Sequence, residues 1–278
     1  MRRPKPIRSS DPPAQHHTLA TSFPYNLQLP SLKGRKVLSC GQKDDMHALA
    51  KAGRIPRVSV YATYFAMDPD SRSPYVLFQR GMNPKTRKPC NDFAVGPGGG
   101  VDVEDLPPAY RRFHSLGKRD KEMLVSVVFH QLNESQQTAT LWAAILRETR
   151  DELLSGNPSS SPLPVLPTTF FDPRKEDFCG LGHSYVDGGL RLFFYRCDFT
   201  HKLRQWQLSV CGGTLNHDQT REAVVNNVMA RRNRYEVHSV YFVPASTRGL
   251  EAAIWPAQQR FFLAAFGSML LEAPAAAS

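Results

Sequence analysis

The chain has 278 residues, of which 41% are hydrophobic, and a formal net charge of +10 from 35 Lys and Arg against 25 Asp and Glu. This length suits one elaborated domain or two small ones. The absence of an apolar run of about 18 residues excludes a membrane-spanning helix and predicts no membrane partner. The basic charge favours a polyanionic partner such as RNA or nucleotide phosphates, although many basic proteins bind no nucleic acid.

The five cysteines are odd in number and include no C-x-x-C pair, which argues against a disulfide framework or a zinc site. This cysteine usage indicates an intracellular, reducing compartment, either the cytoplasm or the nucleus. Residues 1–54 are rich in proline, serine and basic side chains and predict an irregular segment. The first ten residues contain four basic and no acidic side chains, so mitochondrial targeting stays open, but the prolines disfavour the amphipathic helix of a transit peptide.

Residues 55–272 contain strand and helix patterns in a mixed order. Segments rich in β-branched and aromatic residues predict a hairpin, 58–67 with 75–80, and a short strand, 93–95, before a glycine run. Later strands are predicted at 190–197, 203–210 and 236–243, and helices at 122–132, 139–154, 220–232 and 256–271. This pattern predicts an α/β or α+β sandwich, with a disordered tail at 273–278.

Two glycine-containing segments are interpreted as turns. GLGHSYVDGG, residues 180–189, carries His183 and Asp187, for which a substrate contact is the alternative. Cys211-Gly212-Gly213 lacks the lysine and the strand-to-helix setting of a phosphate-binding loop.

The predicted helix 139–154 carries an acidic cluster. Glu148 and Glu152 are four residues apart on one helical face, with Asp151 beside them. Three close carboxylates repel one another unless a cation neutralises them, and oxygen ligands suit Mg²⁺ or Mn²⁺ bound together with substrate phosphates. The alternative is a solvated surface patch that Arg147 and Arg150 partly neutralise.

Two motifs together resemble the Nudix hydrolase family. The segment PGGGVD, residues 97–102, resembles the glycine-rich opening of the family's box, G-x5-E-x7-R-E-U-x-E-E-x-G-U, and RETRDE, residues 147–152, resembles its core. The strands VSVYATYFAM, YVLFQRG and EVHSVYFVPAS are similar to those that flank a Nudix box. The resemblance covers about residues 57–270 and implies a Nudix-like α/β/α sandwich with a mixed sheet.

The box departs from the family pattern. Counting from Gly98 places Glu104 at the first acid position, whereas the more usual alignment of PGGGVD places Asp105 there. The distance to Arg147 requires an insertion at about 106–138 that loops out before the helix. Three further positions differ: Thr149 stands at an apolar position, Asp151 replaces a glutamate, and Leu154 replaces the closing glycine.

The resemblance implies a role for each matching residue. Metal ligands would be Glu148, Asp151, Glu152 and Glu104 or Asp105, holding Mg²⁺ or Mn²⁺. Arg147 would orient the carboxylates, and Glu236, or more weakly Glu222, would serve as the general base in attack by activated water. Gly98, Gly99 and Gly100 would let the backbone approach the phosphates, with Arg80 facing the substrate.

The implied function is a metal-dependent hydrolase that cleaves a diphosphate linkage in a nucleoside diphosphate derivative. The basic charge favours a capped or 5′-phosphorylated RNA end, with a small nucleotide as the other option. The basic cluster of Arg231, Arg232 and Arg234 is a candidate RNA contact, with a solubilising helix end as the alternative. For Tyr110 and Phe113 in the insertion, stacking on bases and burial in the core are the two alternatives. The competing hypothesis is a non-catalytic Nudix-like module that binds RNA or a protein partner within a larger assembly.

Overall fold

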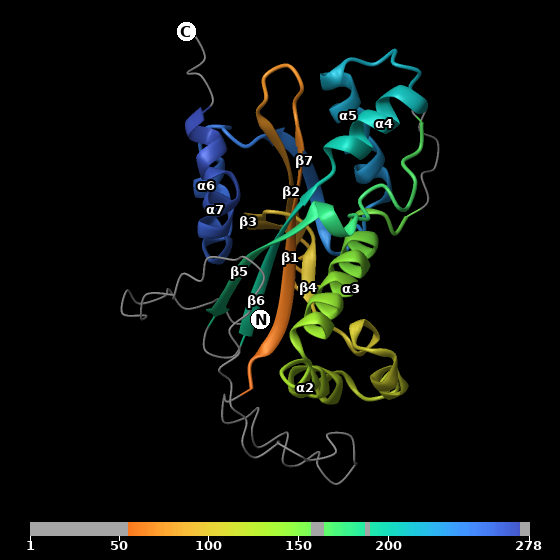
Figure 1. Ribbon diagram of the computed structural model, residues 1–278, viewed down its shortest axis with the longest axis vertical. Helices are drawn as coiled ribbons and strands as arrows, with labels where there is room; N and C mark the ends of the chain where they lie inside the picture. The colour runs from red at the N-terminus through yellow and green to blue at the C-terminus, as the bar shows by residue number, and fades with distance from the viewer. Residues whose placement is uncertain (1–54, 157–163, 187–189, 273–278) are drawn as a thin grey trace.

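The computed structural model describes residues 55–156, 164–186 and 190–272 (Figure 1). The predicted irregular segment 1–54, the predicted tail 273–278 and Asp187 lie outside the described residues. None of the described helices is both long and apolar enough to cross a membrane.

A seven-stranded mixed sheet forms the centre of the fold. Its main path runs through β3 (Pro89–Ala94), β2 (Pro74–Met82), β1 (Arg57–Met67), β6 (Leu190–Asp198) and β5 (Phe178–Val186). In addition, β4 (Gly98–Gly100) pairs with β1, and β7 (Val237–Pro244) pairs with β2. β1 and β6 run parallel, and the other strand pairs are antiparallel.

Helices cover both faces of this sheet, which confirms the predicted α+β architecture with a mixed sheet (Figure 1). Alternate side chains of β1 enter different cores, because successive residues of a strand point to opposite faces. Val60 and Tyr64 join the core beneath α2 (Lys118–Phe129) and α3 (Glu134–Leu153), whereas Phe65 packs with Phe266 of α7 (Pro256–Glu272) on the other face. The remaining helices are α4 (Thr200–Ser209), α5 (His217–Arg231) and α6 (Leu250–Ala253).

The predicted hairpin is present, but β1 and β2 pair over only three residues each, 65–67 with 74–76. This short contact lets β1 diverge from β2 and pair with the glycine strand β4 over residues 59–61. The predicted strands 190–197 and 236–243 and the predicted helices 122–132, 220–232 and 256–271 are confirmed as β6, β7, α2, α5 and α7.

The insertion is folded and contributes to the core. It forms a 3₁₀ helix at Pro108–Phe113 and then α2, whose Leu124 and Val128 are buried in the core that also contains β1. Tyr110 and Phe113 are partly buried and pack against the same core, which favours packing over base stacking as their role. The helix that follows the insertion begins earlier than the predicted residue 139. Asn133 and Gln136 form a capping box that starts α3 at Glu134.

Two further predictions of local structure were wrong. The segment 203–210 is the last part of α4 and its end, not a strand, because Leu203 and Trp206, three residues apart, share the face of a helix that packs against the core. The segment 180–186 is not a turn but the larger part of edge strand β5, which pairs with β6 through a register shift between Gly180 and Gly182.

Candidate active site

Helix α3 is fixed on the sheet by a buried polar contact. Thr149, which occupies an apolar position in the resembling motif, is fully buried, and its Oγ1 lies 2.9 Å from the Oη of Tyr64 on β1. Leu141 and Ile145 extend the same buried seam. This packing leaves the opposite face of α3, with Arg147, Glu148 and Asp151, facing a cavity.

The glycine strand β4 lies directly against the carboxylates of α3. A Cβ atom added at Gly99 would lie 2.5 Å from Oε1 of Glu148, and one added at Gly98 would collide with the carbonyl oxygen of Val60. Gly100 has open space at this position. Gly98 is therefore required by the close approach of the β1 backbone, whereas Gly99 makes room for the carboxylate of Glu148 in its observed position.

Arg147 joins the two halves of the interrupted motif. Its guanidinium donates to both carboxylate oxygens of Asp105, at 2.8 Å from Nη2 and 3.1 Å from Nε at the closest. It also donates to Glu148 Oε1 and to the Gly100 carbonyl oxygen, each at 2.8 Å. Burial alone lowers the pKa of Arg147, but the hydrogen bond and charge of Asp105, followed by the charge of Glu148, raise that pKa above its ordinary value.

These contacts place Asp105, and not Glu104, at the site. Asp105 lies at the end of the 3₁₀ helix Val103–Asp105, and its side chain is only 3% exposed. Glu104 is exposed and does not line the cavity. The structure therefore does not bring the predicted ligand Glu104 to the other carboxylates, because the short helix turns its side chain outward.

Glu148 and Glu152 lie at different depths. The Glu148 side chain is 14% exposed and lines the cavity; burial raises its pKa, against the opposing charge and hydrogen bond of Arg147. Glu152 is buried behind it, where it accepts hydrogen bonds from Gln79 Nε2 at 2.5 Å and from the Gly98 N–H. Burial raises the pKa of Glu152 to about 8, and the negative charges of Glu148 and Glu236 add to that rise.

Gln79 is a site residue that the sequence analysis missed. It lies on β2, is buried, and donates to Glu152 from the strand next to the glycine motif. The available signal was a polar residue within the apolar strand segment YVLFQR. A buried polar side chain needs a hydrogen-bond partner, and here the partner is the acidic helix.

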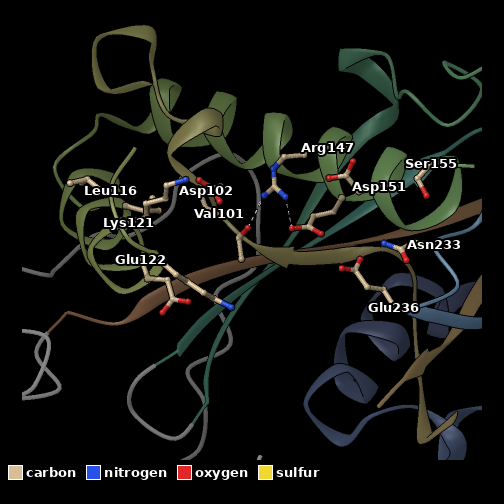
Figure 2. Close-up of a pocket in the computed structure, with 14 residues that line it drawn as sticks. Val101, Asp102, Leu116, Lys121, Glu122, Arg147, Asp151, Ser155, Asn233 and Glu236 are labelled. Carbon is tan, nitrogen blue, oxygen red and sulfur yellow. Dashed lines mark hydrogen bonds and ion pairs between the residues drawn. The ribbon is translucent and has the colours of Figure 1, made fainter. Parts of the chain in front are cut away.

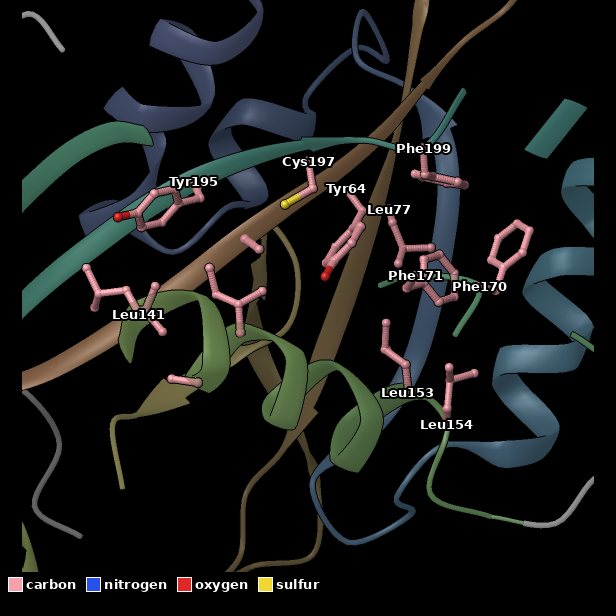
Figure 3. Close-up of a cluster of buried hydrophobic side chains, with 14 of the residues drawn as sticks. Tyr64, Leu77, Leu141, Leu153, Leu154, Phe170, Phe171, Tyr195, Cys197 and Phe199 are labelled. Atoms are coloured by element: carbon pink, nitrogen blue, oxygen red, sulfur yellow. The ribbon is translucent and has the colours of Figure 1, made fainter. Parts of the chain in front are cut away.

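A cavity of about 690 Å³ lies in front of α3 (Figure 2). Glu236 and Asn233, from the connection between α5 and β7, face Asp151 across it (Figure 2). The connection is held by the hydrogen bonds Asn233 N–H to Glu152 O, 3.1 Å, and Met82 N–H to Glu236 O, 2.7 Å. The predicted general base Glu236 is thus in the cavity, whereas the weaker candidate Glu222 is exposed on α5 and does not line it.

Three of the predicted substrate or RNA contacts lie elsewhere and bind the backbone. Arg80 donates to the Cys90 carbonyl oxygen at 2.6 Å and stacks over Phe93. Arg231 is buried and donates to the carbonyl oxygens of Gly156 and Leu166. Arg232 donates to the carbonyl oxygens of Val237, His238 and Met229.

Arg234 is exposed and stays a candidate RNA contact. His183 lies within β5, where its Nε2 is 3.1 Å from an Arg191 guanidinium nitrogen, and it does not line the cavity. Cys211, Gly212 and Gly213 form the predicted turn after α4.

The comparisons with known proteins are weak. No protein-family model matches the chain, and no curated protein matches it. A solved mutT/nudix family protein from Listeria innocua is similar with a TM-score of 0.35 and 12% identity, covering 78% of this chain and 96% of that one. A NUDIX hydrolase from Alicyclobacillus acidocaldarius is similar with a TM-score of 0.28 and 13% identity, covering 63% and 93%. Likeness of this extent carries no functional argument.

Proposed function

We propose that the chain is a Nudix-type, metal-dependent hydrolase that cleaves a diphosphate linkage in a nucleoside diphosphate derivative. The observation that carries the proposal is the contact of Arg147 with Asp105, Glu148 and Gly100. This contact brings the glycine-rich opening and the acidic helix into one site, although Asp105 and Arg147 are 42 residues apart in the sequence. The two motif halves thus meet as the family resemblance requires, despite the insertion between them.

The donor chemistry of the cavity fits a hard divalent cation such as Mg²⁺ or Mn²⁺. Glu148, Asp151 and Glu236 offer carboxylate oxygens to one cavity. Burial, and to a smaller extent the charges of neighbouring carboxylates, raise the pKa values of Glu148 and Glu152, and a bound cation would favour their ionised forms. Among the described residues, no group of three or more His, Cys, Asp or Glu side chains is close enough to hold an ion. Magnesium needs no such group, because it commonly binds through one or two carboxylates, several waters and the substrate's phosphates.

In this proposal Glu148 and Asp151, which line the cavity, would hold the metal, and the buried Glu152 would support the site. When bound, the metal would neutralise the charge that develops on the phosphates and lower the pKa of an attacking water. Arg147 keeps Glu148 in place through a charge-assisted hydrogen bond. Glu236, exposed at the cavity rim, accepts the proton of the attacking water.

An RNA 5′ end is the preferred substrate class within this proposal. Between the cavity residues Asn233 and Glu236, the chain presents Arg234 and Tyr235 outward, and the Tyr235 side chain is 69% exposed. The guanidinium of Arg87, from the turn between β2 and β3, stacks on the Tyr235 ring at 4.9 Å. A cationic and aromatic rim of this kind can hold a strand that leaves the cavity, because bases stack on aromatic rings and phosphates pair with arginines.

The test is a panel assay with Mg²⁺ or Mn²⁺ on 5′-triphosphate RNA, capped RNA, ADP-ribose, a dinucleoside polyphosphate and a nucleoside triphosphate. Glu148→Gln removes a proposed ligand, and Glu134→Gln makes the same change on an exposed position of α3 outside the cavity. We expect metal-dependent cleavage that Glu148→Gln abolishes and Glu134→Gln retains. Equal activity of both variants contradicts the proposal.

A second candidate function is a non-catalytic module that binds RNA or a protein partner. One observation favours it: Glu152 already receives hydrogen bonds from Gln79 and the Gly98 N–H, so it has a structural role without any ion. This alternative predicts RNA binding that depends on Arg87 and Tyr235, no turnover of any panel member, and the same RNA affinity in Glu148→Gln as in the wild type.

A further inference from the structure

The cavity has two ends of different charge (Figure 2). Asp151 and Glu236 lie at one end, near the last turns of α3 and the start of β7. Lys121 lies at the other end, on α2, and Arg147 lies between them (Figure 2). The insertion contributes Leu116, Lys118, Lys121, Glu122 and Val125 to this α2 end, and Val101 and Asp102, which precede the insertion, also line it (Figure 2).

The two lysines share this end with two acids, Asp102 and Glu122, which also line the cavity. Of the neighbouring acids, Glu122 lies 3.7 Å from Arg57, and Asp102 accepts the hydrogen bond of the Val103 N–H. Within the described part of the chain, neither Lys118 nor Lys121 forms an ion pair. Two lysines one helical turn apart that line one cavity, without an ion-pair partner among the described residues, have ammonium groups available to an anion.

The same end lacks the means to bind a nucleoside. No Phe, Tyr, Trp or His is among the described residues that line the cavity. The Phe and Tyr residues of the insertion pack in or against the hydrophobic core instead: Phe129 is buried in it, and Tyr110 and Phe113 are partly buried against it. Protein recognition of an unpaired base commonly relies on stacking against an aromatic ring, so the α2 end suits a compact anion and not a base.

We propose that Lys118 and Lys121 bind a phosphate that lies beyond the scissile diphosphate bridge, an inference that rests on the proposed function. The substrate then ends in a free phosphate, as a 5′-triphosphate does, and not in a second nucleoside, as a cap or a dinucleoside polyphosphate does. Hydrolysis adds water across the bridge: the water oxygen bonds to one phosphorus, the bridging oxygen departs with the other phosphate group, and one water proton is released. The lysine pair holds the departing phosphate group.

This assignment gives the insertion a function. The residues that separate the glycine opening from the acidic helix fold into α2, which packs on β1 and places both lysines in the cavity that Arg147 and Glu148 also line. The insertion thus determines substrate choice, whereas the two motif halves on either side of it carry the chemistry. Removal of the lysine charges should change which substrate binds without removing the carboxylate site.

The test compares Lys121→Glu with Arg119→Glu, which makes the same charge change on an exposed α2 position that does not line the cavity. The double variant Lys118→Ala/Lys121→Ala accompanies them, and thermal unfolding confirms that each variant folds. The KM values for a 5′-triphosphate substrate and for a dinucleoside polyphosphate are measured with the full chain. We expect the triphosphate KM to rise about tenfold in both lysine variants, with a change of about twofold at most in Arg119→Glu and for the dinucleoside substrate.

Binding of inorganic tripolyphosphate without divalent metal separates this inference from the proposed function. Wild-type binding that weakens about tenfold in the lysine variants and not in Arg119→Glu supports the phosphate subsite even if no panel substrate is hydrolysed. Hydrolysis with unaltered kinetics and unaltered tripolyphosphate binding in the lysine variants overturns the subsite and leaves the hydrolase intact. A lysine effect that is equally large for the dinucleoside substrate also overturns it.

Discussion

Arg147 on α3 and Asp105 after the glycine strand form a bidentate ion pair, which brings together the two parts of the motif that flank the inserted segment. The Asp105 side chain is 3% exposed and the Arg147 side chain 25% exposed, so both charges depend on their partner. This pair explains how a motif can be interrupted by some thirty residues and still assemble one site.

Replacing Arg147 with Ala should destabilise the fold by about 3 kcal/mol, because it leaves the buried Asp105 carboxylate without its partner. The matched control is Arg150→Ala on the same helix, which removes an ion pair between Asp172 and a half-exposed arginine and should change the unfolding free energy by about 1 kcal/mol at most. Urea unfolding measures both changes. Equal losses would mean that the Arg147–Asp105 pair is an ordinary surface contact.

Gly99→Ala should distort the carboxylate site, since its Cβ would lie 2.5 Å from Glu148 Oε1. Gly100→Ala is the control, because nothing lies within 4 Å of a Cβ at that position. We expect Gly99→Ala to lower the unfolding temperature and to abolish metal-dependent turnover, and Gly100→Ala to preserve both. Similar behaviour of the two variants would contradict the close approach of Glu148 to β4.

The Glu152 carboxyl should make the metal-free protein less stable at high pH. Its pKa is raised from 4.5 to about 8 in the fold, so between these values the folded state holds a proton that the unfolded state has released. The stabilisation is fully present below about pH 4.5 and is lost as the pH rises through about 8. Glu152→Gln removes this dependence. In urea unfolding experiments with EDTA at about pH 5.5 and about pH 8.5, the free energy of unfolding should therefore differ less between the two pH values for the variant than for the wild type. Parallel pH profiles of wild type and variant would show that Glu152 ionises normally.

Tyr64 and Thr149 should be coupled energetically, because their hydroxyls are hydrogen-bonded to each other in the core. A double-mutant cycle with Tyr64→Phe and Thr149→Val should give a coupling free energy of about 1 kcal/mol. Additive single effects would show that the 2.9 Å contact does not anchor α3 on β1.

The basic cluster at the end of α5 should separate into a structural and an exposed part. Arg231→Ala should destabilise the protein by about 2 kcal/mol, because it removes the donor to two backbone carbonyl groups in a buried region. Arg234→Ala should leave the unfolding free energy unchanged and weaken RNA binding. Urea unfolding and a fluorescence binding assay distinguish these outcomes, and a stability loss in Arg234→Ala would contradict the assignment.

The strands β1, β2, β6 and β7 and the helices α2, α3, α5 and α7 could be predicted from the sequence, because the composition and spacing of their apolar residues are typical of a strand or of a helix. The acidic face of α3 followed from the spacing of Glu148 and Glu152, and Glu236 was placed near it by the family resemblance. The prediction of a strand at 203–210 was wrong because a short apolar run does not distinguish a strand from a helix. The prediction of a turn at 180–186 was wrong because a high glycine content is also compatible with an edge strand that contains a register shift.

Contacts between distant segments could not be predicted in the same way. Glu104 and Asp105 are adjacent in the sequence, and only the local helix decides which of them reaches Arg147. Gln79 and Lys121 reach the site through strand pairing and through the fold of the insertion. Arg231 and Arg232 have the composition of an RNA contact, but the carbonyl groups of neighbouring segments bind their side chains.

The most direct test of the central claim is the Mg²⁺-dependent turnover of a 5′-triphosphate substrate by purified wild type, Glu148→Gln and Glu134→Gln, with phosphate products identified by ³¹P NMR. We expect Mg²⁺-dependent cleavage of a diphosphate bridge by wild type and Glu134→Gln, and no cleavage by Glu148→Gln. Metal-independent cleavage, or equal rates in Glu148→Gln and Glu134→Gln, would contradict the claim that the carboxylates of α3 form a metal-dependent hydrolase site.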